Sequence, residues 1–246
     1  MNRILAALMF FTSLPFWRIK QVPTECFKHV VNYWPFVGWL TGGVMAGVYW
    51  LTSHVFPTEV AAILAVVSRL LVTGALHEDG LADFFDGFGG GTDRTRILSI
   101  MKDSHIGSYG VISLICYFLL LIGLIASLPL HIGVCALLAF DAWNKFVAAN
   151  LINLLPYARK EEESKAHTVY ARMHPREFLF AALGGACWML ILLPPRLWLS
   201  AVCSVVVFLL LVGLMKRKLN GYSGDCCGAT FLLCELSSYI GVYLCI

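Results

Sequence analysis

The feature that most constrains this chain is a series of long apolar runs, several of them 18 residues or more. A helix needs about 20 such residues to cross the roughly 30 Å hydrocarbon layer of a bilayer. With 59% hydrophobic and 13% charged residues, the composition excludes an ordinary soluble domain and a disordered chain. The sequence therefore predicts an all-α, polytopic integral membrane protein whose helical bundle lies in the lipid bilayer.

The apolar runs predict about seven transmembrane helices. They cover residues 35–56, 59–76, 109–128, 131–152, 178–193, 197–215 and 229–246. The first apolar stretch, residues 4–17, is short for a span and contains Pro15, so it predicts a short interfacial helix at the N-terminus. We expect residues 1–246 to form a single transmembrane domain.

The basic residues predict the orientation of these helices. Long polar connections alternate with tight turns near Pro57, Pro129 and Pro194. The long connections hold fourteen of the eighteen Lys and Arg residues and cover 18–34, 77–108, 153–177 and 216–228. By the positive-inside rule these connections face the cytoplasm and the tight turns face the other side. The run from Lys160 to Glu163 carries both signs and is interpreted as a solvated surface only.

Three aspartates begin the connection 77–108. Asp79, Asp83 and Asp86 have the spacing i, i+4 and i+7, so they share one narrow stripe if the preceding helix continues. Carboxylates so close repel one another, and a hard divalent cation removes that conflict. Mg²⁺ prefers carboxylate oxygens and often bridges to substrate phosphates. The stripe predicts a Mg²⁺ site for a phosphorylated substrate, with solvated surface carboxylates as the alternative.

Cations and small residues follow the aspartates. Arg94, Arg96 and Lys102 could neutralise phosphate oxygens, or could only mark the cytoplasmic side. Ser104 and Gly107 precede the next apolar run, and their backbone groups could cradle an anion. We interpret 77–108 as an active-site loop on the cytoplasmic side.

Ionisable residues within the apolar runs have two interpretations. Asp141 and Lys145 are four residues apart and can pair on one helix face, or can contact a substrate. Glu235 also lies at membrane depth, which indicates a functional role by default. Arg69 either extends to the interface or faces a polar interior.

At these residues the chain resembles the cobalamin synthase family, membrane enzymes also called adenosylcobinamide-GDP ribazoletransferases. Three motifs in the same order carry the resemblance, and the opening Phe11-Thr12-Ser13-Leu14-Pro15 is similar too. The first motif consists of Leu76-His77, residues 79–83 and Asp86-Gly87. The second consists of residues 100–104, Ile106-Gly107 and Gly110. The third consists of Gly221-Tyr222, Gly224-Asp225, Gly228-Ala229 and Glu235. Glu78 departs from a family position that is usually apolar, and His105 departs from one that is usually arginine.

The resemblance implies a Mg²⁺-dependent transferase in a prokaryotic cytoplasmic (inner) membrane. It would join adenosylcobinamide-GDP to α-ribazole, or to the 5′-phosphate of α-ribazole, and release GMP. The implied metal ligands are Asp79, Asp83, Asp86 and Glu78; the implied catalytic residues are Asp103, His77 and Lys102; and the implied substrate-binding residues are Arg94, Arg96, Ser104, Gly107, Asp225 and Glu235. Asp103 is expected to be the general base or a further metal ligand.

Two other functions fit part of the pattern. A CDP-alcohol phosphatidyltransferase also uses Mg²⁺ and clustered aspartates, but Gly87 is followed here by Phe88 and three glycines instead of the rest of that signature. A transporter would also carry intramembrane charges, although here the carboxylates concentrate outside the apolar runs. The net charge of +3 is too small to indicate a nucleic-acid partner, and the oligomeric state is left open, a homo-oligomer included.

Overall fold

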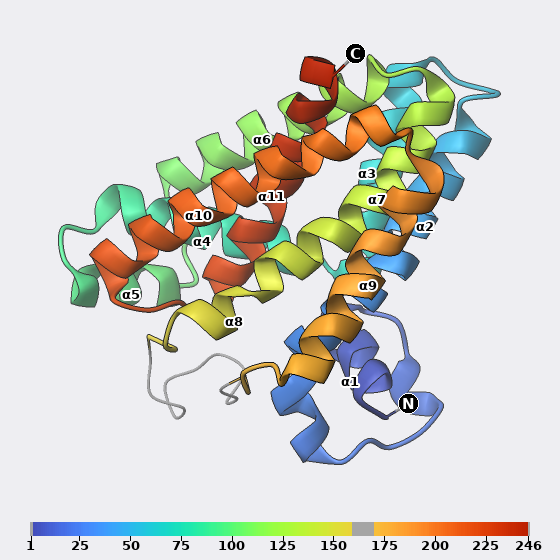
Figure 1. Ribbon diagram of the computed structural model, residues 1–246. Coiled ribbons are helices and arrows are strands. Elements are labelled where there is room, and N and C mark those ends of the chain that lie inside the picture. Colours follow the sequence, from blue (N-terminus) through green and yellow to red (C-terminus); the bar gives the residue numbers. More distant parts are fainter. Residues whose placement is uncertain (1, 159–169, 246) are drawn as a thin grey trace.

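The computed structural model describes residues 2–158 and 170–245. The whole run from Lys160 to Glu163, with Arg159 and Lys165 beside it, therefore lies outside the described residues. The regular structure of the described residues is helical, and the all-α prediction is confirmed (Figure 1). The α-helices are α1 (Asn2–Phe11), α2 (Trp34–Thr52), α3 (Thr58–Thr73), α4 (Leu76–Gly90), α5 (Arg94–Lys102), α6 (Ser108–Ala126), α7 (Leu130–Ala149), α8 (Leu151–Leu154), α9 (Pro175–Leu192), α10 (Ser200–Leu219) and α11 (Gly224–Cys245). Short 3₁₀ helices are η1 (Phe16–Arg18), η2 (Thr24–Tyr33) and η4 (Pro195–Leu199).

Every predicted apolar span is a helix, but the predicted number of seven spans is not confirmed. Five helical stretches of the described chain are long and apolar enough to cross a membrane, and a sixth is added if α3 and α4 form one bent span. The glycines, tryptophans and Pro35 of α2 lower its mean hydropathy, although it is 19 residues long. The N-terminal stretch forms α1, which is 10 residues long and packs against η2.

Burial separates inner from outer helices. In the most apolar stretches of α7 and α11, 78% of residues are buried, compared with 22–28% in α6, α9 and η4–α10. The outer helices therefore expose apolar side chains of the kind that a lipid-facing surface requires. Figure 1 shows the described parts of the long basic connections along the left and lower sides of the bundle, from α5 to the blue segment after α1, and the tight turns with the C-terminus at the top and upper right.

A sharp bend separates α3 from α4. The two helix axes differ in direction by 92°, and the residues between them, Gly74 and Ala75, have left-handed φ angles of 64° and 57°. Ser13 contacts the residues of this bend, and its backbone N–H donates a 2.7 Å hydrogen bond to Val72 O. A side chain on Gly74 would bring its Cβ within 2.6 Å of Ser13 Oγ. The bend turns the chain into α4, so the segment 77–108 is mostly helix and not the predicted loop.

A buried charge network joins five helices at this level. Arg69 on α3 is 0% exposed, and its Nη1 lies 2.7 and 2.8 Å from the two carboxylate oxygens of Glu235 on α11. Its Nη2 donates to Tyr117 Oη on α6 over 2.6 Å and lies 3.5 Å from Glu78 Oε1 on α4. Asp141 Oδ2 on α7 lies 3.6 Å from Arg69 Nη1. Arg69 therefore faces the interior and fixes α4 relative to the helices around it.

Asp141 and Lys145 form the ion pair that their spacing predicts. Lys145 also donates to Thr41 Oγ1 over 3.0 Å, and its Nζ lies 4.2 Å from the ring centre of Phe231. Both charged side chains are 0% exposed. The pairing interpretation of these two residues is the one that the structure supports, because charges inside a membrane bundle need partners.

Replacing Arg69 by Met should destabilise the protein by about 3–5 kcal/mol, because Glu78 and Glu235 would lose their buried cation. The measurement is the free energy of unfolding in detergent by denaturant titration. The double variant Arg69→Met/Glu235→Gln should recover part of that loss. Wild-type stability in the single variant would show that Arg69 does not hold these carboxylates.

Candidate functional site

Two of the predicted metal ligands line one cavity. Asp79 and Asp83 lie one turn apart on α4 and face a hollow of about 230 Å³, which we call the polar cavity. Its other walls come from the end of α5 and the segment after it, and its remaining lining residues are Ala82, Lys102, Asp103, Ser104 and Ile106. The predicted residues Asp79, Asp83, Lys102, Asp103 and Ser104 therefore meet at one place.

Asp86 has a different position from the one predicted. Its carboxylate accepts the backbone N–H of Gly107 over 2.7 Å and that of Gly110 over 2.8 Å. Both donors belong to the start of α6, where unpaired N–H groups and the helix dipole favour an anion. A residue seven positions after Asp79 shares its stripe but lies about 10 Å further along the helix. Asp86 thus anchors α6, and its carboxylate is the anionic group that the Gly107 N–H binds in this structure.

Glu78 and Glu235 also lie away from the polar cavity. Glu78 is 3% exposed and Glu235 is 0% exposed, and both face Arg69 in the buried network. Glu78 precedes Asp79 by one residue, which turns its side chain by about 100° around α4. The structure therefore places Glu78 and Glu235 beside a buried cation and outside the polar cavity, and their predicted metal-binding and substrate-binding roles stay predictions.

The three predicted phosphate-binding cations lie at different places in the structure. Lys102 lines the polar cavity. The Nη2 of Arg94 donates to the backbone carbonyl of Ala158 over 2.7 Å and so holds α5 against that segment. Arg96 is exposed, and its backbone N–H donates to Asp93 Oδ1 at the start of α5 over 3.0 Å. Of these three cations, the structure brings Lys102 to the aspartates.

Asp103 has a neighbour that the sequence did not connect with it. The ring Nδ1 of His105 lies 2.6 Å from Asp103 Oδ1, and the His105 backbone N–H donates to the same oxygen over 3.0 Å. The hydrogen bond from the His105 ring lowers the pKa of Asp103 below its usual value. The carboxylate is therefore ionised at neutral pH.

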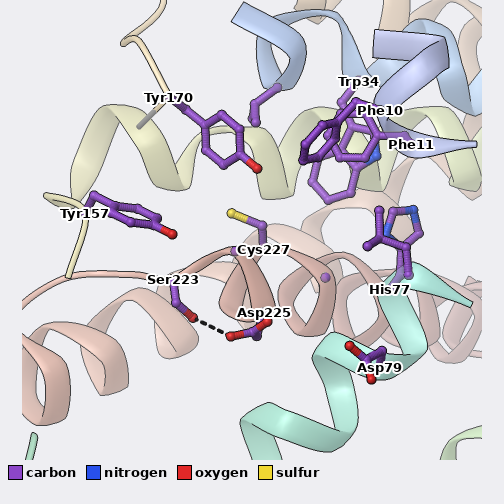
Figure 2. A pocket seen from close by; sticks show the side chains of 14 residues that line it. Phe10, Phe11, Trp34, His77, Asp79, Tyr157, Tyr170, Ser223, Asp225 and Cys227 are labelled. Carbon is purple, nitrogen blue, oxygen red and sulfur yellow. Dashed lines mark hydrogen bonds between the residues drawn. The ribbon is translucent and has the colours of Figure 1, made fainter. Parts of the chain in front are cut away.

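A second cavity lies on another side of Asp79. Six of its fourteen lining residues carry aromatic rings, and we call it the aromatic cavity (Figure 2). Its lining residues are Phe10, Phe11, Val31, Trp34, Leu76, His77, Asp79, Tyr157, Tyr170, Ser223, Gly224, Asp225, Cys227 and Gly228. Figure 2 shows the rings of Trp34, Phe11 and Tyr170 on one side, and Ser223, Asp225 and Asp79 on the other. Of the predicted residues, His77 and Asp225 lie here and not in the polar cavity.

Close helix packing places Asp225 near α4. A Cβ on Gly80 would lie 3.0 Å from Asp225 O, and a Cβ on Gly228 would lie 3.1 Å from His77 O. These two glycines let the start of α11 pass close to α4. Ser223 Oγ donates to Asp225 Oδ2 over 3.3 Å, as the dashed line in Figure 2 marks. The first and third sequence motifs therefore meet at the aromatic cavity.

Sequence reasoning missed the aromatic walls of this cavity. Phe11 and Trp34 stack with ring centres 4.9 Å apart and planes 12° apart, and the His77 ring lies 5.3 Å from that of Trp34. The ring centres of Phe10 and Tyr170 lie 6.1 Å apart. These rings come from four separate segments of an aromatic-rich chain, so no spacing links them. Phe11, the first residue of the opening motif, was the one available signal.

Replacing Asp86 by Asn should lower the free energy of unfolding by about 1–3 kcal/mol, because an amide offers one acceptor for two buried N–H donors. Denaturant titration in detergent measures this change. The control is Glu25→Gln on the exposed surface of η2, which should stay within about 0.5 kcal/mol of wild type. Equal stability of both variants would exclude an anchoring role for Asp86.

Comparison with known proteins gives one consistent family. Residues 3–243 match the family described as cobalamin-5-phosphate synthase. An adenosylcobinamide-GDP ribazoletransferase of Shewanella frigidimarina is 35% identical over 250 residues, which cover 98% of this chain and 93% of that protein. The protein of the same name from Shewanella amazonensis is 37% identical over 246 residues, which cover 98% of this chain and 94% of that protein. No solved structure matches the chain.

Proposed function

The chain belongs to the cobalamin-5-phosphate synthase family and is a transferase of cobalamin synthesis. We propose that its reaction depends on Mg²⁺ and that Asp79 and Asp83 hold this ion. In that reaction adenosylcobinamide-GDP and α-ribazole, or α-ribazole 5′-phosphate, would give adenosylcobalamin or its phosphate and GMP. The observation that carries the proposal is the polar cavity, where two carboxylates, Lys102 and Asp103 face one space.

The residues of the polar cavity fit a Mg²⁺ ion bound together with a substrate. No group of three or more His, Cys, Asp or Glu side chains among the described residues is arranged to hold a metal. Mg²⁺ commonly takes one or two carboxylates and completes its shell with water and substrate phosphates, so Asp79 and Asp83 are sufficient. When bound, it would polarise the diphosphate and stabilise charge on the departing GMP.

The protein's own residues would handle the proton and the remaining charge. A ribazole hydroxyl oxygen would bond to the phosphorus attached to cobinamide, and the bond from that phosphorus to the oxygen of GMP would break. The hydroxyl proton would pass to Asp103, which its contact with His105 keeps ionised. Lys102 would neutralise the phosphate oxygens as charge shifts between them.

The placement of the cavity supports a site that faces the cytoplasm of a prokaryotic cell. The polar cavity is formed by α4 and by the end of α5 with the segment after it, in the long connection 77–108. Figure 1 shows this region at the same end of the bundle as the other basic connections. The positive-inside rule places that end in the cytoplasm. The proposed location is the cytoplasmic (inner) membrane.

The intramembrane charges do not favour a transporter. Asp141, Lys145 and Glu235 are all 0% exposed and bind one another or Arg69. A transport site would need such groups to face a path for the solute. Turnover by protein in detergent, where no sealed compartment exists, distinguishes an enzyme from a transporter.

Replacing Asp83 by Asn should abolish GMP release while leaving the protein folded, because it removes a metal-binding charge and keeps the side-chain shape. The assay is GMP release by purified protein with both substrates and Mg²⁺, and unfolding measurements show that the variant folds. Glu25→Gln serves as the control and should keep wild-type turnover. Near-normal turnover by the Asp83 variant would remove this residue from the metal site.

Replacing Lys102 by Met should lower kcat by about 10²–10³ and change the KM for α-ribazole little, because the charge matters most in the transition state. Initial rates measured over a range of both substrates separate the two constants. Lys216→Met removes an exposed cation from another basic connection and should keep wild-type constants. An unchanged kcat in the Lys102 variant would contradict its role at the phosphates.

A further inference from the structure

The two cavities have Asp79 in common, yet the proposed phosphate chemistry uses only the polar one. The aromatic cavity is therefore a prepared space next to the reacting groups without an assigned ligand. Its walls indicate what could fill it. Flat aromatic surfaces bind flat rings by stacking, and such stacking tolerates a ring that has few polar atoms.

Two buried ring nitrogens at the aromatic cavity point to a ligand. Trp34 is 1% exposed and His77 is 2% exposed, and both side chains line the cavity. Trp34 Nε1 and His77 Nε2 have no hydrogen-bond partner in the part of the chain that the structure describes. Leaving a buried polar group unpaired is costly, and an indole N–H can only donate. A ligand atom that accepts a hydrogen bond would satisfy the Trp34 N–H.

The two substrates of the proposed function offer different bases to such a cavity. Guanine carries several donors and acceptors around its edge, and each would need a partner on the side of the cavity formed by Phe10, Phe11 and Trp34, where Trp34 Nε1 is the polar atom. The base of α-ribazole is a dimethylbenzimidazole, which is flat, apolar and has one ring nitrogen left to accept a hydrogen bond. The dimethylbenzimidazole base therefore fits aromatic walls with a single indole donor better than the guanine base does.

We propose that the aromatic cavity is the subsite for the benzimidazole base of the acceptor nucleoside, an inference that rests on the proposed function. The base lies among Phe11, Trp34 and Tyr170, and its free nitrogen accepts from Trp34 or His77. The ribose then lies on the opposite side, where Figure 2 shows Asp79, Asp225 and Ser223. Asp79 belongs to both cavities, so a ribose hydroxyl is delivered to the phosphate at the polar cavity.

The first test removes part of the aromatic wall. Tyr170 is half-buried at the cavity, so Tyr170→Leu should fold. We expect the KM for α-ribazole to rise at least fivefold while the KM for adenosylcobinamide-GDP stays within twofold of wild type. Tyr243→Leu, which replaces an exposed tyrosine on α11 that does not line this cavity, should change neither constant. An unchanged KM for α-ribazole in the Tyr170 variant would overturn the assignment.

The second test removes one donor and needs no turnover. Trp34→Phe keeps a ring and loses the N–H, and Trp188→Phe is the matched control because its Nε1 is also buried without a partner among the described residues. Calorimetric titration of each protein with free 5,6-dimethylbenzimidazole, without metal or nucleotide, should show at least threefold weaker binding in the Trp34 variant only. Equal affinities in wild type and both variants would count against the proposal.

The outcomes of these tests distinguish a wrong ligand for the aromatic cavity from a wrong proposed function. Weaker binding of GMP with unchanged binding of dimethylbenzimidazole in the Tyr170 and Trp34 variants would make the cavity a guanosine subsite and overturn the proposal. Wild-type protein that binds the free base but releases no GMP from the complete mixture would refute the proposed function instead. The binding titration is informative in both cases because it requires neither Mg²⁺ nor the cobinamide substrate.

Discussion

The guanidinium of Arg69 is the interaction on which the rest of the structure depends. A charge inside an apolar bundle must be paired, and Arg69 is paired at once with Glu235, Tyr117 and Glu78. These contacts join helices on both sides of the bend between α3 and α4. Because α4 carries Asp79 and Asp83, the position of the candidate site follows from a network that lies outside both cavities.

Close contacts then assemble the site around α4. Asp86 holds the start of α6 through two backbone N–H groups, and Gly80 and Gly228 let the start of α11 approach α4. Segments that are far apart in sequence thereby surround Asp79, with a polar cavity on one side and an aromatic cavity on the other. This arrangement separates the charged part of a reaction from the binding of a flat apolar group, while keeping both within reach of one carboxylate.

Local patterns in the sequence predicted what local forces determine. Apolar runs gave the helices, and the spacing of Asp79 and Asp83 correctly placed them on one face of α4. The same spacing could not show that Asp86 meets Gly107, because that partner is set by the packing of α6 on α4. The left-handed turn at Ala75 was equally hidden, since nothing about an alanine indicates a positive φ. The aromatic cavity depends on contacts between distant segments, which periodicity does not report.

The most direct test of the central claim is GMP release by purified protein in detergent, supplied with adenosylcobinamide-GDP, with and without α-ribazole and with and without Mg²⁺. The account predicts release only when both the nucleoside and the metal are present, because the hydroxyl and the ion act on the same phosphate. Release that is unaffected by removing Mg²⁺ with a chelator would contradict the assignment of Asp79 and Asp83 as metal ligands. Absence of release by folded protein in the complete mixture would contradict the proposed reaction.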